Sequence, residues 1–338
     1  MSGYPLVSVV IPFYDGRAFL TETLRSFCEQ EYQLWECLVI DDYSPVSGED
    51  ICRSMNDKRI RYIKNDGSAG MANARNKGCS IAKGEFIALC DQDDISLPQR
   101  LSKQVEILKK NEALLLVGSW RQNFGENNHE VHYVTDDELI KMRLMGNSQF
   151  ANPSVMFRSA LISQMNMRFD QNMAPSDDYD FICRVSLRGE LTNIPEVLLL
   201  YRVHDKQVST QKSKEMETLA YKIRKTYILE RLSPWISHGL DIRTMVDIFS
   251  LKGCADYSSK EIVTLFSSYV QLNAIHPLWT DVYWKAFLGE RLLLVVKFLE
   301  LSRIQKLKIM VEHKSFIMAF LYNGMIRNRL KFTIKSIW

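Results

Sequence analysis

The sequence lacks the features that mark membrane-spanning, secreted and zinc-binding proteins. No uninterrupted apolar run approaches the roughly 20 residues that a bilayer-spanning helix needs, and the longest candidates, 292–296 and 316–322, are flanked by charge. The N-terminus has no basic start, so we do not expect a signal peptide. The seven cysteines are odd in number and include no C-x-x-C pair, which argues against a disulfide framework and a zinc site. We expect reduced thiols and a cytoplasmic location.

A large net charge is also missing. The chain of 338 residues carries only +3, too little to indicate nucleic acid as a partner. Residues 303–338 hold eight Lys or Arg and one acid, giving +7 and leaving −4 for the remainder. Because the tail interleaves basic and apolar residues, we expect a peripheral contact with the anionic inner face of the cytoplasmic membrane. The alternative is a basic helical subdomain that packs on its neighbour.

Short strands and helices alternate in the first 100 residues. The β-branched or apolar runs Val7–Pro12, Leu38–Ile40 and Phe86–Cys90 each end at a proline or an aspartate. Apolar residues at three- and four-residue steps predict helices around 20–28 and 73–81. This alternation predicts an α/β fold with a mainly parallel sheet covered by helices on both faces. Ligands of such sheets bind outside the carboxyl ends of the strands.

The pattern changes twice further along the chain. Residues 111–201 contain several prolines, and we expect this region to be broken into short elements. Residues 206–214 are polar and indicate a linker, after which the spacing of apolar residues becomes helical. We therefore predict a catalytic domain over 1–210 and an α-helical C-terminal region over 211–338.

The strongest local feature is the acidic block Asp91–Asp94, which directly follows an apolar strand. Three carboxylates within four residues repel one another unless a cation lies among them. Hard divalent cations prefer oxygen ligands and usually take phosphate oxygens as well. The block therefore indicates a clamp for a metal–diphosphate group. The alternative is a helix N-cap with solvated acids.

Two further acidic pairs and one histidine have similar alternatives. Asp41 and Asp42 end a strand and can accept hydrogen bonds from a nucleoside, or form an Asx turn. Asp177 and Asp178 open a helical segment, where one carboxylate can act as a general base or favour the helix N-terminus. His204 is a candidate metal ligand, although a lone histidine is more often structural.

The order of these features resembles glycosyltransferase family 2, which has the GT-A fold. The resemblance covers about two-thirds of the chain. It is carried by Val7–Pro12, Asp41–Ser44, Gly70 to Gly78 with Ala74-Arg75-Asn76, Gly84–Ile87, Asp91–Pro98, Asn152–Ser154, Asp177–Asp180 and Tyr201–His204. Any one of these segments is a weak signal, but eight in order are specific.

The resemblance implies a nucleotide-sugar donor, most often a UDP-sugar, and an Mn²⁺ or Mg²⁺ cofactor. It assigns the nucleotide to Pro12, Tyr14, Asp41, Asp42, Arg75 and Asp91, with uracil at Asp42 and its neighbour. In the D-x-D motif, Asp93 is expected on the metal, with His204 as a further ligand, and Asp94 assists by contacting a sugar. Asn152 is also expected to contact the acceptor or the sugar.

The resemblance implies a single displacement with inversion. Asp178 matches the general base of the family's Glu-Asp motif, whereas Asp177 replaces the glutamate beside it and is the expected acceptor contact. An α-linked donor then gives a β-glycoside. Such hexosyltransferases commonly build O-antigen, capsule or exopolysaccharide on lipid-linked glycan acceptors. The alternatives are a catalytically inactive binding module and a nucleotidyltransferase that forms nucleotide-sugars.

Overall fold

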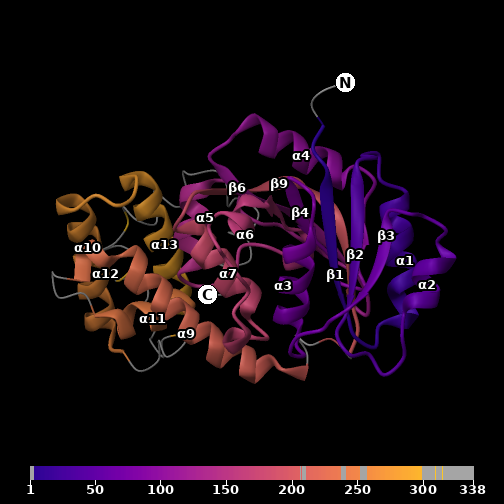
Figure 1. The fold of residues 1–338 in the computed structure, drawn as a ribbon. Coiled ribbons are helices and arrows are strands. Elements are labelled where there is room, and N and C mark those ends of the chain that lie inside the picture. The colour runs from indigo at the N-terminus through magenta and orange to yellow at the C-terminus, as the bar shows by residue number, and fades with distance from the viewer. Residues whose placement is uncertain are drawn as a thin grey trace. The chain divides into compact units, whose positions relative to one another are not determined.

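The computed structural model describes residues 4–205, 207, 211–236, 241–251, 257–298, 309 and 314 (Figure 1). These residues belong to two compact units, one made of 1–137 with 148–223 and the other of 138–147 with 224–338. The basic tail for which we predict membrane contact, 303–338, therefore lies outside the described residues except at 309 and 314.

One mixed sheet forms the frame of the first unit. Its strands are β1 (Val7–Phe13), β2 (Trp35–Asp41), β3 (Ile60–Lys64), β4 (Phe86–Leu89), β5 (Ile95–Ser96), β6 (Leu114–Gly125), β7 (Glu130–Val131), β8 (Met156–Arg158) and β9 (Glu190–Val203). They run in the order β3-β2-β1-β4-β8-β6-β9-β5, with β7 beside β6. The pairs among β1 to β4 and the β6–β9 pair are parallel, whereas β8, β5 and β7 are antiparallel to their neighbours.

Helices cover both faces of this sheet, as predicted. They are α1 (Arg17–Cys28), α2 (Glu49–Ser54), α3 (Met71–Ile81), α4 (Arg100–Lys110), α6 (Ala160–Ser163) and α7 (Asp177–Ser186), with 3₁₀ turns η1 (Asn152–Ser154) and η2 (Gln171–Met173). Val9 and Ile11 of β1 share a core cluster with Leu20 of α1. A methyl group on Gly78 of α3 would instead overlap Val10. Because alternate strand residues point to opposite faces, α1 and α3 lie on opposite sides of β1 (Figure 1).

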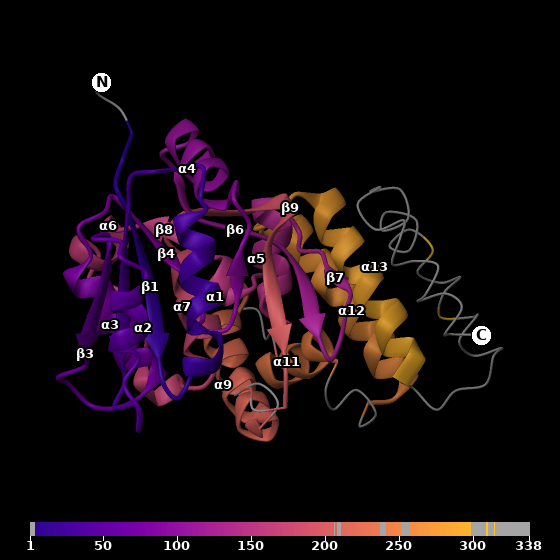
Figure 2. The same ribbon diagram turned by 90° about the vertical axis from the view of Figure 1, so that its right-hand side faces the viewer.

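The prediction of short elements over 111–201 was wrong for two strands. β6 has 12 residues and β9 has 14, and the two run parallel, side by side, with β7 on the other side of β6 (Figure 2). β9 continues through Pro195, one of the prolines behind that prediction. The pairing register shifts there, from Ser119 with Ile194 to Trp120 with Val197. A bulge of this kind accommodates a residue that cannot donate to the ladder.

The second unit is helical. It contains α5 (Asp137–Leu144) from residue 138 onward, the end of α9 (Ser213–Arg231), α10 (Ser233–Ile236), α11 (Ile242–Ser250), α12 (Ser259–Ile275) and α13 (Asp281–Phe298). Aromatic rings fill its core, with Phe249 of α11 5.2 Å from Phe287 of α13. Arg143 of α5 forms a 2.9 Å ion pair with Glu290 of α13. Across the described segments, every helix is too short or too polar to cross a lipid bilayer.

Candidate active site

Two adjacent carboxylates at the end of β2 are held by neutral donors. Asp42 accepts hydrogen bonds from Asn65 Nδ2 at 2.9 Å and from the Gly70 N–H at 2.8 Å. Gly70 has a φ of +128°, a left-handed conformation that glycine adopts without strain. Asp41 Oδ1 accepts from the Ser44 N–H at 2.9 Å. The two acids assigned to the nucleoside are therefore buried, and the loops around them fix their orientation.

Exposed tyrosines follow β1 and β2. Tyr14 comes directly after β1 and is 59% exposed, and Tyr43, just beyond β2, is 56% exposed. The Tyr43 hydroxyl donates to the Gly67 carbonyl at 2.6 Å. Pro12 lies within β1 and is half-buried. An aromatic surface is thus available beside Asp41 and Asp42 at the same edge of the sheet.

The fold brings the two candidate metal ligands together. Asp93 Oδ2 lies 2.9 Å from Nε2 of His204, although 111 residues separate them in the chain. His204 follows the last residue of β9, whose neighbour Arg202 donates from its backbone N–H to Asp94 Oδ1 and from Nε to the Asp93 carbonyl, both at 2.9 Å. Asp94 is fully buried, and its Oδ2 has no hydrogen-bond partner within the described chain.

Arg75 is a buried centre of positive charge between α3 and α7. Its Nη1 lies 2.7 Å from Asp177 Oδ2, and its Nη2 lies 3.7 Å from Asp91 Oδ1. Burial alone would lower the pKa of Arg75, but the charges of Asp177, Asp91 and Asp178 raise it. Arg75 is only 4% exposed and Asp177 is fully buried. In this geometry Asp177 faces Arg75, which gives its expected acceptor contact no geometric support.

The candidate general base lies in the first turn of α7. Asp178 is half-buried, and its Oδ1 accepts from the N–H of Tyr179 at 2.8 Å. Burial and the charge of Asp177 raise the pKa of Asp178 to about 6, although Arg75 acts against this rise. Burial likewise raises the pKa of Asp91 to about 6 against the effect of Arg75, with Asp93 and Asp178 adding to the rise. The acids after β4 and at the start of α7 thus act on one another electrostatically.

Unsatisfied polar atoms mark further residues. Asn152 in η1 is 7% exposed, and its Nδ2 has no hydrogen-bond partner in the described part of the protein. The same holds for Asn123 Oδ1 and Arg121 Nε on β6, where the Arg121 guanidinium stacks 3.9 Å from the Tyr201 ring centre. Sequence reasoning missed Arg121 and Asn123, because polar residues within a strand pattern give no signal of a site. It also missed Gln92, whose side-chain amide forms two 2.8 Å hydrogen bonds with the Tyr14 backbone.

The Asp93–His204 contact is a hydrogen bond in this structure, and its length also suits two ligands of one divalent cation. Two adjacent ligands of an octahedral Mg²⁺, each at about 2.0–2.1 Å, lie about 3 Å apart, close to the observed 2.9 Å. The described residues contain no group of three His, Cys, Asp or Glu side chains arranged to hold a metal. Mg²⁺ usually takes one or two carboxylates together with substrate phosphates, so a site completed by a diphosphate needs no third side chain.

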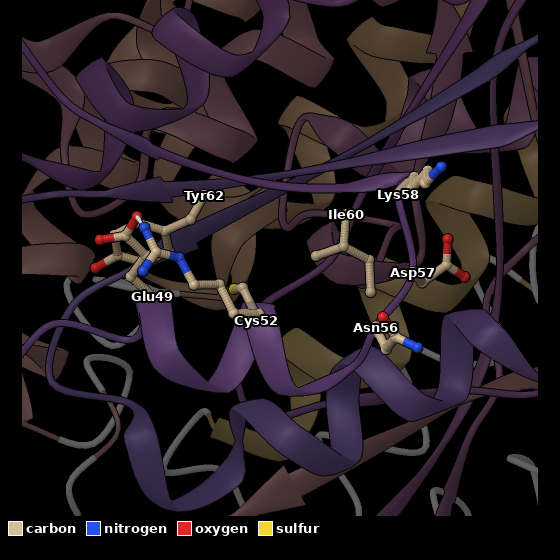
Figure 3. Close-up of a pocket in the computed structure, with 8 residues that line it drawn as sticks. Glu49, Cys52, Asn56, Asp57, Lys58, Ile60 and Tyr62 are labelled. Carbon is tan, nitrogen blue, oxygen red and sulfur yellow. Dashed lines mark hydrogen bonds and ion pairs between the residues drawn. The ribbon is translucent and has the colours of Figure 1, made fainter.

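A separate cavity of about 270 Å³ lies beside α2 and β3. Glu49, Cys52 and Asn56 reach it from α2 or its end, and Tyr62 from β3 (Figure 3). Burial raises the pKa of the Cys52 thiol to about 12, so this thiol is protonated and a poor nucleophile at neutral pH. None of the candidate site residues lines this cavity.

Comparison with known proteins identifies the family of this chain. Glycosyl transferase family 2 matches residues 8–170. An uncharacterized glycosyltransferase from Haemophilus influenzae is 30% identical over 81% of this chain and 88% of its own length. The UDP-Glc:alpha-D-GlcNAc-diphosphoundecaprenol beta-1,3-glucosyltransferase WfgD of Escherichia coli is 25% identical over 63% of this chain and 83% of its own. The chain belongs to glycosyltransferase family 2 and is a glycosyltransferase.

Solved structures share the fold. S. aureus TarS 1-349 in complex with UDP-GlcNAc superposes with a TM-score of 0.58 at 14% identity, over 95% of this chain and 93% of that one. The mannosyltransferase PcManGT from Pyrobaculum calidifontis, in complex with GDP-Man and Mn²⁺, gives 0.53 at 16% identity over 86% and 88%. The sheet with its helices is thus the GT-A fold, and the C-terminal helical region is present.

Proposed function

We propose that this enzyme transfers a sugar from a UDP-sugar to a hydroxyl of a lipid-linked glycan, with inversion and with a divalent metal. The observation that carries the proposal is the position of Asp91, which lies near the buried Arg75 and interacts electrostatically with Asp178 and with Asp93, the partner of His204. A metal–diphosphate next to a proton acceptor is what a single displacement of a nucleoside diphosphate requires.

The nucleoside is assigned to the ends of β1 and β2. Asp42 and Asp41 accept hydrogen bonds from the uracil, and Pro12 and Tyr14 frame the base. Acids at strand ends bind nucleosides in other α/β proteins. The guanidinium of Arg75 is paired with Asp177 and lies near Asp91. We therefore assign Arg75 to holding Asp91, which faces the ribose, rather than to direct contact with the nucleotide.

Asp178 is assigned the proton of the acceptor hydroxyl. A carboxylate with a pKa of about 6 is ionised at neutral pH and is a stronger base than an ordinary aspartate. Asp93 and His204 would hold an Mn²⁺ or Mg²⁺, and such an ion would supply positive charge for the diphosphate leaving group. Asp94 and Asn152 are assigned to hydroxyls of the transferred sugar or the acceptor, because each has an unused buried polar atom.

The acceptor and pathway rest on similarity. WfgD takes its name from UDP-Glc, a diphosphoundecaprenol-linked acceptor and a β-1,3 product, and TarS was solved with UDP-GlcNAc. These names support a UDP-sugar, a lipid-linked acceptor and a β-glycoside. We further propose a role in O-antigen, capsule or exopolysaccharide synthesis. A cytoplasmic location at the inner membrane face, with contact through 303–338, is part of the same proposal. So is the division into a catalytic domain, 1–210, and a helical region, 211–338.

A screen of UDP-sugars for release of UDP, with and without Mn²⁺, tests the proposal. Many such transferases slowly transfer to water, so one sugar should give metal-dependent release that Asp93→Ala abolishes. Asp281→Asn, an exposed carboxylate of the second unit, is the control and should match wild type. Absence of both UDP release and metal-dependent UDP binding in the wild type would refute the proposed donor site.

A further inference from the structure

Gln92, the middle residue of the D-x-D motif, forms hydrogen bonds with the loop that follows β1. Gln92 Oε1 accepts from the Tyr14 N–H, and Gln92 Nε2 donates to the Tyr14 carbonyl, both at 2.8 Å. The Thr23 hydroxyl of α1 donates to the Gln92 carbonyl at 2.9 Å. Because both ends of the side-chain amide and the backbone carbonyl are bonded, the orientation of residue 92 is fixed between its acidic neighbours.

Hydrogen bonds continue from this loop to the acids after β2. The Ser44 hydroxyl accepts from the Asp15 N–H at 3.2 Å and donates to the Phe13 carbonyl at 3.3 Å. The Ser44 N–H donates to Asp41 at 2.9 Å. The backbone of 13–15 therefore links Asp41, on the nucleoside side, to Gln92, on the metal side.

The glycine after this loop is shaped around the same amide. Gly16 has φ −103° and ψ 20°, a conformation open to any residue. A methyl group at Gly16 would nevertheless overlap the side-chain amide of Gln92. The absence of a side chain at position 16 is therefore explained by Gln92 and not by backbone strain.

We propose that Gln92 is a positioning residue that fixes the distance between the nucleobase subsite and the metal–diphosphate subsite. The inference rests on the proposed UDP-sugar function. A ligand that carries both a base and a diphosphate binds tightly only when the two subsites are correctly spaced, since the second contact is then intramolecular. A ligand that carries the diphosphate alone needs no such spacing.

The test compares these two ligands. With Mn²⁺ present, Gln92→Ala should weaken UDP binding about tenfold, the effect of losing one or two net hydrogen bonds. Binding of Mn²⁺-pyrophosphate, which lacks the base, should change less than about twofold because its own contacts remain. Gln99→Ala is the matched control: the side-chain amide of that glutamine donates to Glu31, which is not one of the candidate site residues, and both affinities should equal those of wild type.

Gly16→Ala adds a second arm. The methyl group should displace the Gln92 amide, so that UDP binding falls at least as far as in Gln92→Ala. In the double variant, Gly16→Ala with Gln92→Ala, the methyl group no longer meets a side-chain amide. Its affinity for UDP should therefore equal that of Gln92→Ala alone. Such non-additivity is expected only of residues that act through one contact. Thermal unfolding of each variant identifies any loss that comes from unfolding.

Three results separate the possible failures. An equal loss of UDP and pyrophosphate binding in Gln92→Ala would show that Gln92 merely supports the metal loop, which overturns the inference. Additive effects of Gly16→Ala and Gln92→Ala would do the same. If the wild type itself binds no UDP in the presence of Mn²⁺, the proposed function fails instead.

Discussion

Two groups of acids are stabilised in different ways: a first group at the end of β2, and a second group made of the acids after β4 and those at the start of α7. Asp41 and Asp42 accept hydrogen bonds from backbone and amide N–H groups, which stabilise their charge without adding a formal charge. Asp91 interacts with Arg75, and Asp178 with Arg75 and the Tyr179 N–H, yet burial and neighbouring acids raise the pKa values of both to about 6. Asp41 and Asp42 are thus already oriented in the absence of a ligand, whereas the group that contains Asp91 and Asp178 carries excess negative charge.

This difference suits the first group of acids to binding a nucleobase and the second group to binding a cation and accepting a proton. A carboxylate whose lone pairs are already directed by fixed donors can select a base with little rearrangement. A group of acids that repel one another attracts a cation and makes one member a better base. Substitutions in the second group should therefore have larger effects on turnover than equivalent substitutions in the first.

Asp178→Asn should give the largest effect. Loss of a general base typically costs about 10²- to 10⁴-fold in rate, and we expect a loss of kcat in this range with little change in the donor KM. The fold should be at least as stable as wild type at neutral pH, because an amide stands for the protonated form that burial favours. Steady-state kinetics and thermal unfolding measure both. A kcat within threefold of wild type would remove Asp178 from the mechanism.

Arg75→Met should cost the most stability. Removing one partner of a buried ion pair typically costs about 3–5 kcal/mol, because the other charge is left uncompensated. Here Asp177 would be stranded without exposure to solvent. Urea unfolding gives the free energy. Arg61→Met is the control, since its pair with Glu36 is 3.5 Å long and Arg61 is largely exposed; it should cost less than about 1 kcal/mol. If the two substitutions lower the free energy of unfolding equally, Arg75 does not compensate the buried charge of Asp177.

The pH dependence should show the shared titration of the second group. Asp178 must be ionised to accept a proton, so kcat/KM should be level above pH 6 and fall about tenfold per pH unit below it. Acid unfolding through these groups is not expected. A carboxyl with a raised folded-state pKa gives stability that is fully present below 3.8 and is lost as pH rises through about 6. Circular dichroism at pH 5 checks that the protein stays folded. If kcat/KM begins to fall only near pH 4, Asp178 is not the general base.

Asp42→Asn should give the smallest effect of the four. One of the donors on Asp42 would then face an amide N–H instead of an oxygen, at a cost of about 1–3 kcal/mol. We expect the donor KM to rise about tenfold while kcat changes less. Donor titration under saturating metal measures both constants. If kcat falls as far as in Asp178→Asn, the contrast between the two groups is wrong.

Local features of the sequence predicted much of this arrangement. The apolar runs ending at Asp41 and Asp91 located two strand ends, because burial and strand termination leave a direct mark on the sequence. The contact between Asp93 and His204 could not be read in this way, since it depends on β9 pairing with β5. The length of β9 was missed because Pro195 normally ends a strand, and only the bulge opposite Trp120 explains its tolerance.

The roles of buried polar residues were the hardest to predict. Arg75 carries the family resemblance, yet only the fold shows that it is bonded to Asp177 and nearly inaccessible. Gln92 occupies a position that sequence reasoning passed over between two acids, and its contacts come from a loop 78 residues away. Such contacts depend on tertiary geometry and leave no periodic pattern.

The late position of His204 has a consequence for synthesis of the chain. β9 is the last strand of the sheet in sequence, and it pairs with β6 and β5, which are made much earlier. During translation the two acids that we assign to the nucleoside, and their donors Asn65 and Gly70, have been made by residue 70, whereas the candidate metal pair must wait for residue 204. Domains fold as units as the chain emerges from the ribosome. A ribosome-bound chain stalled before β9 has emerged would therefore contain the acids that we assign to the nucleotide but lack one of the two groups that we assign to the metal.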